Sequence, residues 1–567
     1  MKARTAAFSV AILPSLLFPI TDMAASRAPV RAAHGMVVAT EPRAAEAGLD
    51  ILKRGGNAVD AAVAVGFALA VTHPLAGNIG GGGFMVVRLA ATGDVKVIDY
   101  RELAPAAASE TMYQDASGEI AGKDSTIGYR ASGVPGTVAG LAQALKKYGT
   151  MQLSAVMAPS IRLARDGVEL SYFESQSLKT SRKILDRFPE TKRIYLRDGN
   201  PYEWGDRFVQ PDLARTLELI AKYGPSEFYE GETARLIAKD MAANGGTITL
   251  DDLKGYQVIE RRPIEGEYRG YKIYSMPPPS SGGIALIEML NMLEPYPLAR
   301  YGPGSSRTLH LEAEAMKRAF ADRAEFLGDP DFVSIPTRGL TSRSYAQERR
   351  SSIDPFIASD SASLGHGNPA PFESEQTTHF SVVDAAGNAV SNTYTLNGGY
   401  GSGVTIPGTG ILLNNEMDDF SSKPGAPNAY GLIHGKANAI APRKRPLSAM
   451  TPTIVLKDGK LFMVLGSPGG PTIINTVLQT LLNVIDFRMS IQEAVDAPRI
   501  HHQWMPDKLT MERIGFSEDV VQALKARGHN VEARGLIGDC QAIMIDPETG
   551  TRLGAADPRL DGRAVGY

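Results

Sequence analysis

The sequence predicts a large globular protein with a layered α/β or α+β fold. Strand patterns and helical patterns follow one another along most of the chain, and no repeat of fixed period interrupts them. The 567 residues are 43% hydrophobic and 21% charged, which is typical of a chain with an extensive buried core. Large disordered regions are therefore not expected.

The N-terminal segment, MKARTAAFSVAILPSLLFPITDMAA, has the layout of a cleavable secretory signal. Lys2 and Arg4 precede an apolar run over residues 6–20, and small residues follow it. This run is shorter than the roughly 20 residues that a membrane-spanning helix needs. We expect residues 1–25 to be removed, leaving a periplasmic or secreted protein without a stable membrane anchor.

Composition and motifs exclude several classes of function. The formal net charge of −3 provides no basic field for nucleic acid. The nine histidines form no His-Glu-x-x-His pattern, and the single cysteine, Cys540, can form neither an internal disulfide nor a thiolate cluster. No Walker loop or Gly-x-Ser-x-Gly motif occurs. Neither a metal nor an organic cofactor is expected.

The first third of the mature chain predicts strands and closely packed helices. GMVVAT reads as a strand, Pro42 begins one helix, and Asn57 caps a second helix that is rich in small residues. Four glycines at residues 80–83 then precede another strand. Because a dinucleotide fingerprint places its glycines between a strand and a helix, tight backbone packing is the better interpretation here.

Residues 132–354 are rich in helical patterns, including TVAGLAQALKKYG, DLARTLELIAKYG and LHLEAEAMKRAFADRAEFLG. We interpret these as packed amphipathic helices and assign them no chemistry. MPPPSSGG interrupts them as a rigid turn or a pocket wall. Residues 351–376 read as a long exposed loop.

A β-hairpin is predicted directly after this loop, and Thr377 and Thr378 stand at its start. HFSVVD and NAVSNTYTL alternate on either side of AAGN, as hairpin strands do. Further on, KLFMVLG predicts a strand, SPGGP a turn and TIINTVLQTLLNVIDF a helix. A threonine pair at a strand start is unremarkable by itself, because branched side chains suit strands.

A chemical interpretation of Thr377 is also available. A threonine hydroxyl needs a base to act as a nucleophile, and an N-terminal threonine can use its own α-amino group, whose pKa is about 7.7–8.0. Cleavage after Gln376 would create that terminus. The backbone amides of Gly469 and Gly470, in the SPGG turn, could stabilise an oxyanion, although such a turn is more often an ordinary strand-to-helix connection.

Several long segments together resemble the γ-glutamyltransferases, also called γ-glutamyl transpeptidases. In the C-terminal third they are TTHFSVVDAAGNAVSNTYTLN, GILLNNEMDDFSSKPG, KRPLSAMTPTIV and GSPGGPTIINTVLQ. Earlier segments agree: DILKRGGNAVDAAVAVGFALAVTHPLAGNIGGGGFM, DYRELAP and MPPPSSGGI. The C-terminal GAADPRLDGRAVGY agrees as well, so the resemblance covers nearly all of the mature chain.

This resemblance implies an N-terminal nucleophile hydrolase with a four-layer αββα sandwich. The precursor would cleave itself between Gln376 and Thr377. Residues 26–376 would form a large subunit and residues 377–567 a small subunit, and the two would share one intertwined core as a heterodimer.

The resemblance also implies roles for individual residues. Thr377 matches the nucleophile, Thr395 the residue that orients it, and Gly469 and Gly470 the oxyanion donors. Arg101 matches the arginine that holds the substrate α-carboxylate, a task that suits its planar charged fork.

The α-amino group of the substrate would be received by Asn397, Glu416 and Asp419. Ser448 matches a serine that helps to hold the carboxylate, but Ala449 stands where the family often has a second serine, so one hydrogen-bond donor is absent. Tyr430, in residues 424–444, matches the residue of a loop that covers the pocket.

The implied activity is transfer of the γ-glutamyl group of glutathione, or of a related amide, to water or to amino acids and peptides. The presence of the covering loop favours a narrow γ-glutamyl pocket. Two alternatives stay open: a β-lactam side-chain acylase for glutaryl or cephalosporin compounds in the same superfamily, and an unprocessed, non-catalytic periplasmic binding protein.

Overall fold

A computed structural model describes residues 26–369 and 381–567. The predicted signal segment, residues 1–25, lies outside the described residues. So do Gln376 and Thr377, together with Thr378, because residues 370–380 are not described. The predicted positions of the nucleophile and of the cleavage site therefore stay predictions.

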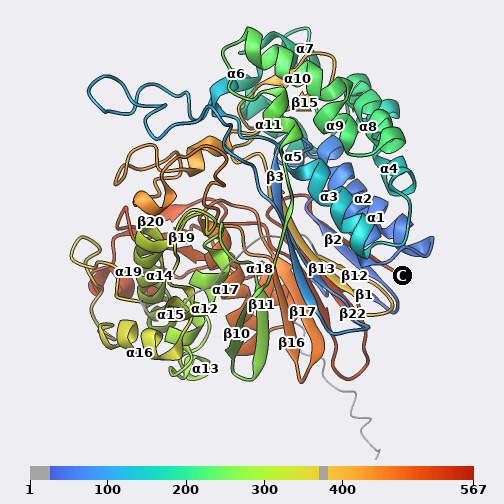
Figure 1. Ribbon diagram of the computed structural model, residues 1–567. Coiled ribbons are helices and arrows are strands. Elements are labelled where there is room, and N and C mark those ends of the chain that lie inside the picture. The colour runs from blue at the N-terminus through green and yellow to red at the C-terminus, as the bar shows by residue number, and fades with distance from the viewer. Residues whose placement is uncertain (1–25, 370–380) are drawn as a thin grey trace, which may run out of the picture.

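Two seven-stranded antiparallel sheets form the centre of the molecule (Figure 1). The first has the order β23-β2-β12-β13-β3-β4-β9, with bounds Arg563–Gly566, Met36–Ala39, Ser381–Val383, Ala389–Thr395, Gly82–Arg88, Val95–Tyr100 and Ile259–Arg261. The second has the order β1-β22-β21-β17-β16-β11-β10, with bounds Val30–Ala32, Arg552–Ala556, Gln541–Ile545, Lys460–Gly466, Thr453–Lys457, Tyr271–Ser275 and Ile264–Tyr268.

The predicted hairpin is confirmed as β12 and β13, in which Val383 pairs with Ala389. Successive strand residues point to opposite faces of the sheet, and the residues on both faces of this hairpin are buried. Val382 belongs to the core cluster beneath the helices, whereas Val383 packs between the two sheets with residues such as Phe84 and Val464. Strands buried on both faces are what a four-layer sandwich requires.

Helices cover the outer face of each sheet. On the first sheet lie α1 (Pro42–Lys53), α2 (Ala58–Thr72) and α3 (Thr137–Tyr148). On the second lie α12 (Gly282–Leu293), α17 (Thr472–Ile485) and α18 (Ile491–Asp496). Figure 1 shows these helical layers on opposite sides of the strands. The predicted αββα sandwich is confirmed.

Local sequence signals account for the helix starts. Pro42 occupies the first turn of α1, and the Asn57 side chain accepts hydrogen bonds from the amides of Val59 and Asp60 at the start of α2. Every residue of α2 is buried. A Cβ on Gly48 would lie 2.6 Å from the Val65 side chain, so this glycine permits the close contact between α1 and α2.

The glycine run at the start of β3 packs tightly, as the sequence predicts. A Cβ on Gly80 would lie 2.2 Å from the carbonyl oxygen of Leu412, and one on Gly81 would lie 2.1 Å from that of Thr395. The run therefore lets β3 lie directly against the end of β13. This packing helps to form the floor of the site described below.

Helix α14 (Ser306–Phe326) differs from the prediction. The sequence suggests an amphipathic helix with a charged face, but the structure also buries most of its charged side chains: Glu312, Glu314, Lys317, Arg318, Asp322 and Arg323. Buried charges need partners, and Arg318 finds one in Glu314 at 2.7 Å. Surrounding segments remote in sequence supply others, which helical periodicity alone does not reveal.

The remaining helices, in chain order, are α4 Leu153–Asp166, α5 Tyr172–Thr180, α6 Arg182–Leu185, α7 Pro189–Tyr195, α8 Pro211–Tyr223, α9 Ser226–Glu230, α10 Glu232–Ala243, α11 Leu250–Lys254, α13 Leu298–Tyr301, α15 Thr337–Leu340, α16 Arg343–Ser351 and α19 Glu518–Ala526. Short strands complete the fold: β5 Val168–Glu169, β6 Leu196–Arg197, β7 Asn200–Pro201, β8 Arg207–Phe208, β14 Thr405–Ile406, β15 Ile411–Leu412, β18 Ile500–His501, β19 Leu509–Glu512 and β20 Val531–Arg534. Within the described residues, short turns of 3-10 helix lie at Tyr129–Ala131, Glu416–Asp419 and Lys436–Asn438.

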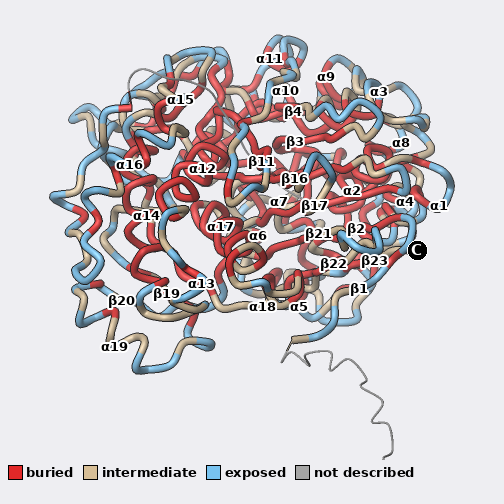
Figure 2. The backbone as a smooth tube through the Cα atoms, turned by 90° about the horizontal axis from the view of Figure 1, so that it is seen from below, coloured by how far each residue is buried: buried red, intermediate tan, exposed pale blue. Residues whose placement is uncertain are grey.

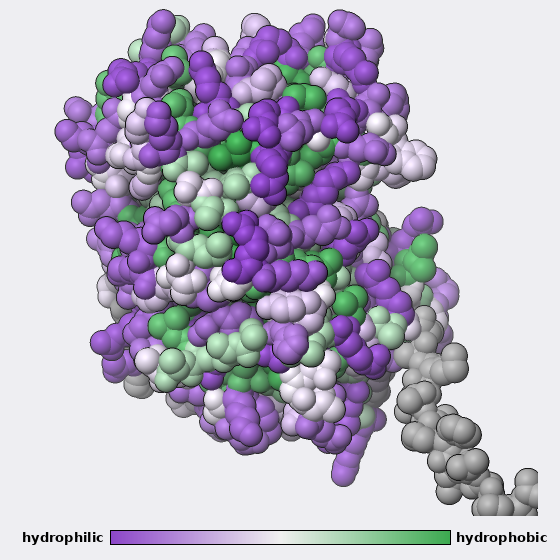
Figure 3. All heavy atoms as spheres, turned by 90° about the vertical axis from the view of Figure 1, so that its right-hand side faces the viewer, coloured by the Kyte–Doolittle hydropathy of each residue, from purple (hydrophilic) through white to green (hydrophobic). Residues whose placement is uncertain are grey.

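Burial follows this layering. Figure 2 shows buried backbone through the central strands and inner helices, with exposed segments at the periphery. On the face shown in Figure 3, hydrophilic side chains predominate and hydrophobic ones are dispersed among them. None of the described helices combines the length and the apolar character needed to cross a membrane. Cys540 is buried.

Candidate functional site

A cavity of about 370 Å³ brings together residues that are far apart in the sequence. Eight of the predicted site residues line it: Arg101, Thr395, Asn397, Asp419, Tyr430, Ser448, Gly469 and Gly470. They come from the ends of β4, β13 and β17 and from the loops between β15 and β16. The layered fold thus gathers the predicted side chains around one space of small-molecule size.

Arg101 is fully buried at the end of β4, and three carboxylates surround its guanidinium. Its Nη1 lies 2.8 Å from Glu416 Oε2 and 3.5 Å from Glu102 Oε2, while its Nη2 lies 2.5 Å from Asp419 Oδ2. Its Nε donates to the carbonyl oxygen of Pro446 at 3.3 Å. This network fixes the planar guanidinium, which suits recognition of a carboxylate.

The two predicted acidic partners occupy different places. Asp419 lines the cavity, whereas Glu416 is fully buried behind it and reaches the site through Arg101. Glu416 Oε2 forms a buried ion pair with Arg101, so both acids contact the same guanidinium. An ammonium entering the cavity beside Asp419 would add a second cation to this network.

Burial determines the protonation of these acids. It raises the pKa of Glu102 to about 7, against the opposing effect of Arg101, and raises the pKa of Glu416 well above its ordinary value. Burial alone would lower the pKa of Arg101, but Glu416, Glu102 and Asp419 outweigh it and raise that pKa. The site therefore holds a permanent cation next to two acids, Glu102 and Glu416, whose proton affinity burial increases.

Because the resemblance implies a glutamyl ligand for this site, we expect binding of L-glutamate to release protons from the network near neutral pH. An incoming ammonium favours the ionised acids, so it displaces protons that the empty site holds below about pH 7. Calorimetry of L-glutamate binding at pH 6.5 in buffers of different ionisation enthalpy measures this release. We expect a fractional proton per ligand, declining by pH 8.5, and a smaller release in Glu102→Gln. Heats independent of the buffer would contradict this.

The raised pKa of Glu102 also makes the stability of the folded protein depend on pH. Since the pKa of Glu102 is raised from 4.5 to about 7 on folding, the folded state binds its proton more tightly than the unfolded chain does. The stability that this tighter proton binding adds is fully present below about pH 4.5, and it is lost as the pH rises through about 7. Substrate binding can compensate for that loss by providing a cation.

The end of β13 shapes the cavity floor. Thr395, its last residue, pairs with Gly82 of β3, and the Thr395 hydroxyl oxygen accepts a hydrogen bond from the Asn397 amide at 2.8 Å. Asn397 has φ 73°, a left-handed conformation that asparagine tolerates. Its Nδ2 donates to the carbonyl oxygen of Asn415 at 3.0 Å, so its side-chain oxygen is available to a ligand ammonium.

Gly469 and Gly470 lie between β17 and α17, where the chain turns at φ 136° and 58°. Their carbonyl oxygens accept from Thr472 and Ile473, whereas neither glycine amide donates to a described residue. A Cβ on Gly470 would lie 3.1 Å from the Tyr430 ring. Two unoccupied amides at a helix N-terminus fit the oxyanion role that the sequence predicts.

The opposite wall contains Ser448 and Ala449. The Ser448 carbonyl oxygen accepts from both the amide and the hydroxyl of Ser281, at 2.9 and 2.7 Å, and this bond anchors the strand-like segment before β16. Ser281 lies in the MPPPSSGG segment, which therefore acts as a rigid turn behind the wall. Ala449 lines the cavity with a methyl group where a second hydroxyl would otherwise lie.

Arg323 is a site residue that the sequence reasoning missed. It lies on α14, is 2% exposed and lines the cavity. Its Nε donates to Ser281 Oγ at 2.9 Å, and burial lowers its pKa to about 10. The helical pattern around Arg323 predicts packing only, and no local motif distinguishes a packed arginine from one that faces a cavity.

Tyr430 lines the cavity from residues 424–444. Its hydroxyl donates to the Asn397 carbonyl oxygen at 2.8 Å, and its ring lies beside Gly470. Asp418 holds the preceding residue by accepting from the Ala429 amide at 3.0 Å. Tyr430 therefore lies at the wall of the cavity, and the covering role that the resemblance implies for it stays a prediction.

A second buried polar cluster lies outside this cavity. His310, Glu314 and His529 bring potential metal-ligand atoms within 4.8 Å of one another, which no sequence motif indicates. However, His310 Nδ1 and His529 Nε2 share a hydrogen bond of 2.8 Å, and Lys317 lies 3.4 Å from Glu314. The cluster forms a hydrogen-bonded ion-pair network that joins α14 to neighbouring segments.

Solved structures place this fold in a known class. The chain resembles the cephalosporin acylase from Bacillus halodurans with a TM-score of 0.85 and 30% identity, covering 99% of each chain. It also resembles the γ-glutamyltranspeptidase of Helicobacter pylori with a TM-score of 0.59 and 46% identity, over 60% of this chain and 97% of the other. The fold and the cavity define an N-terminal nucleophile hydrolase.

Sequence comparison identifies the family. Residues 44–567 match the gamma-glutamyltranspeptidase family model, and the chain belongs to that family. A relative from Escherichia coli strain K12, named glutathione hydrolase proenzyme, is 52% identical over 541 residues, which cover 95% of this chain and 93% of the relative. The proenzyme name and the shorter solved Helicobacter chain indicate a precursor that is processed into a heterodimer.

Proposed function

We propose that the protein is a γ-glutamyltransferase and glutathione hydrolase whose nucleophile is Thr377, exposed as an N-terminus by self-cleavage after Gln376. One observation carries the proposal: a single cavity joins the buried Arg101, with its surrounding acids, to the free amides of Gly469 and Gly470. The first part suits the α-amino and α-carboxylate groups of a glutamyl unit, and the second suits its reacting carbonyl.

The reaction follows from this arrangement. The Thr377 hydroxyl attacks the γ-amide carbonyl and passes its proton to the α-amino group of Thr377. The amides of Gly469 and Gly470 stabilise the oxyanion, an effect worth roughly 100- to 1,000-fold per donor. Collapse of the intermediate expels the amine half with that proton and leaves a γ-glutamyl ester on Thr377. Water or an amine then attacks the ester and restores the hydroxyl.

The proposal includes maturation and export. Residues 26–376 become the large subunit and residues 377–567 the small subunit, after loss of the signal segment 1–25. Donors are glutathione and related γ-glutamyl compounds, and acceptors are water, amino acids or short peptides. Fractionation of producing cells tests the export step, because both fragments should accompany periplasmic or secreted marker proteins.

The acylase alternative makes a different substrate prediction. We expect the anilide of γ-glutamate to be hydrolysed at least about 100-fold faster, as kcat/KM, than the glutaryl anilide that lacks only the α-amino group. The α-ammonium of the γ-glutamyl anilide can pair with Asp419, and removing one partner from a buried charge pair costs about 3–5 kcal/mol, whereas the glutaryl anilide offers no such partner. Steady-state kinetics with the two anilides measures the ratio.

The Asp419→Asn variant provides the matched comparison, because it should reduce γ-glutamyl turnover far more than glutaryl turnover. Equal use of both anilides by the wild type, or a preference for the glutaryl compound, would favour acylase activity. A protein recovered uncut and without turnover of either anilide would favour the binding-protein alternative.

A further inference from the structure

Asn438 is a fully buried residue behind the candidate active site, and it does not line the cavity. Its Nδ2 donates to the Asp419 carbonyl oxygen at 2.6 Å, and its Oδ1 accepts from the Leu447 amide at 3.0 Å. The Nδ2 also lies 3.1 Å from His434 Nδ1. Because an amide nitrogen can only donate, His434 Nδ1 accepts this bond. Both polar atoms of the Asn438 side chain are thus in use.

These bonds join two segments that line different parts of the cavity. Asp419 ends the 3-10 turn at Glu416–Asp419, and it lines the cavity. Leu447 directly precedes Ser448, and both line the cavity from the opposite wall. The Asn438 amide therefore fixes the spacing between the turn that carries Asp419 and the segment that carries Ser448.

Arg101 makes a second bridge between the same two segments. Its Nη2 lies 2.5 Å from Asp419 Oδ2, and its Nε donates to the Pro446 carbonyl oxygen at 3.3 Å. Arg101 thus holds the carboxylate of Asp419, whereas Asn438 holds the main chain of the same residue. Because a side chain pivots about its own backbone, the charged contact alone does not fix where this carboxylate lies. The two bridges together fix it.

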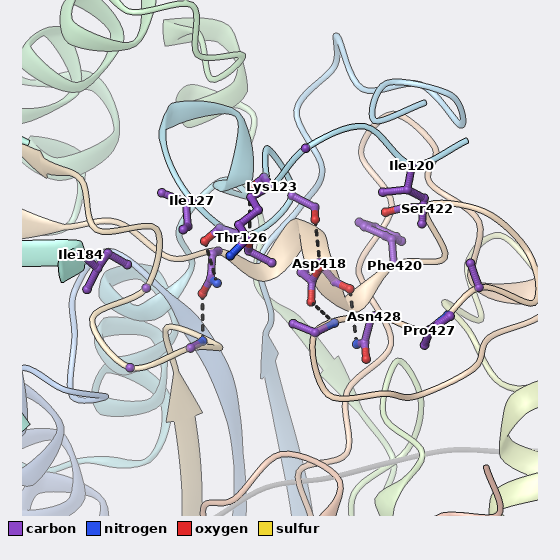
Figure 4. Close-up of a pocket in the computed structure, with 18 residues that line it drawn as sticks. Ile120, Lys123, Thr126, Ile127, Ile184, Asp418, Phe420, Ser422, Pro427 and Asn428 are labelled. Carbon is purple, nitrogen blue, oxygen red and sulfur yellow. Dashed lines mark hydrogen bonds between the residues drawn. The ribbon is translucent and has the colours of Figure 1, made fainter. Parts of the chain in front are cut away.

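The residue before Asp419 is held from another direction. Asp418 lines a neighbouring cavity, where its carboxylate accepts from the Ser125 hydroxyl at 2.9 Å and from the Ala429 amide at 3.0 Å (Figure 4). These bonds anchor the far side of the turn. They leave the Asp419 carbonyl oxygen, on the near side, to Asn438.

The chemistry of this position suits asparagine. One planar group has to donate on one side, to a carbonyl oxygen, and accept on the other, from a main-chain amide. Aspartate has the same shape, but its ionised carboxylate would place an acceptor against the Asp419 carbonyl oxygen. His434 adds direction, since burial lowers its pKa well below the ordinary value and keeps Nδ1 free to accept. The amide is therefore held in the orientation that both bridged segments require.

We propose that Asn438 is a positioning residue that sets where the Asp419 carboxylate lies relative to Ser448, and that it thereby gives the site its preference for substrates with an α-amino group. The inference rests on the proposed function, in which Asp419 receives that group. Asn438 acts through the main chain of Asp419 and does not contact the substrate. A shift of Asp419 weakens binding of γ-glutamyl compounds, and it leaves glutaryl compounds, which have no α-amino group, nearly unaffected.

Turnover of the γ-glutamyl and glutaryl anilides tests this role. In Asn438→Ala we expect the ratio of the two kcat/KM values to fall at least about tenfold, because the residue that pairs with the α-ammonium loses its support. The loss should appear as a higher KM for the γ-glutamyl anilide, with kcat for both anilides within about threefold of the wild type, as happens when ground-state and transition-state binding weaken equally. Asn438→Asp keeps the acceptor for Leu447 and loses the donor, so it should lower the ratio as well.

Asn475 provides the matched control, because its amide is buried in a similar way and it does not line the cavity. Its Nδ2 lies 2.8 Å from His501 Nδ1 and donates to the His502 carbonyl oxygen at 3.1 Å. Urea unfolding should show a loss of stability in both Asn475→Ala and Asn438→Ala, whereas only Asn438→Ala should change the anilide ratio. A merely structural role for Asn438 would leave the ratio unchanged in both variants.

His434→Ala is the mildest variant, since it removes only the acceptor that orients the amide, and it should lower the ratio about two- to fivefold. It decides the question if both Asn438 variants fail to fold. A wild-type ratio in every folded variant at Asn438 and His434, or an equal fall in Asn475→Ala, would overturn the positioning role and leave the proposed function intact. A wild type that hydrolyses neither anilide would overturn the proposed function itself.

Discussion

Replacing Thr377 by alanine is expected to leave a single uncut chain without γ-glutamyl anilide turnover. The substitution removes the hydroxyl that both attacks the preceding carbonyl during maturation and attacks the substrate afterwards. We expect the wild type to give two fragments on a denaturing gel, the smaller beginning at Thr377, and the variant to give one band. Activity should fall by at least about 10⁴-fold, as is usual when a covalent nucleophile is removed.

Thr378→Ala is the matched control, since it removes the neighbouring hydroxyl, to which we assign no chemistry. It should be cleaved and should retain most of its turnover. Separate expression of residues 26–376 with a 377–567 fragment that begins with alanine distinguishes lost maturation from lost catalysis. An intact wild-type chain with full activity would contradict the processing scheme.

Replacing Arg101 by glutamine is expected to have the second largest effect. The change leaves Glu416, Glu102 and Asp419 without the cation that they share inside the protein. Removing one partner from a buried ion pair costs about 3–5 kcal/mol, which the raised pKa values of Glu102 and Glu416 reduce because these acids can take up protons. Urea unfolding measures the lost stability, and kcat/KM should fall at least about 100-fold.

Two further variants separate folding from binding. Arg101→Lys keeps the positive charge but loses the planar fork, so it should preserve most of the stability while the KM for γ-glutamyl donors rises. Arg54→Gln removes an arginine whose ion pair with Asp50 is exposed, and it should change stability by no more than about 1 kcal/mol. Full donor affinity in Arg101→Gln would contradict the assigned role.

Much of the layered fold could be predicted from local sequence patterns. Pro42 and Asn57 define the starts of α1 and α2, and alternation around AAGN defines the hairpin β12–β13. These signals are local, because caps, turns and periodicity depend on neighbouring residues. The order of the strands within each sheet is not local, and the sandwich arrangement came from the resemblance to a family.

The chemistry of the site was less accessible from the residues alone. Thr377 and the SPGG turn have a chemical interpretation, but the roles of Arg101, Asn397 and Asp419 came from the resemblance. The structure adds that Asp419 contacts Arg101 directly and that both line one cavity. Contacts between residues more than 300 positions apart depend on the completed fold, so no sequence spacing predicts them.

Arg323 shows where sequence reasoning falls short. It lies within a helical pattern whose charges suggest a solvated face, yet α14 is buried and directs this side chain to the cavity. The environment of the side chain, and not its neighbours in sequence, determines its place in the site.

Mapping the covalent intermediate tests the central claim most directly. The protein is mixed with a γ-glutamyl donor, quenched in acid within the first turnovers, digested and analysed by mass spectrometry. We expect the added γ-glutamyl group on the peptide that begins with Thr377, and its loss when glycylglycine is supplied before the quench. A γ-glutamyl group on another residue, or an intact chain across residues 376 and 377 in the active protein, would contradict the account.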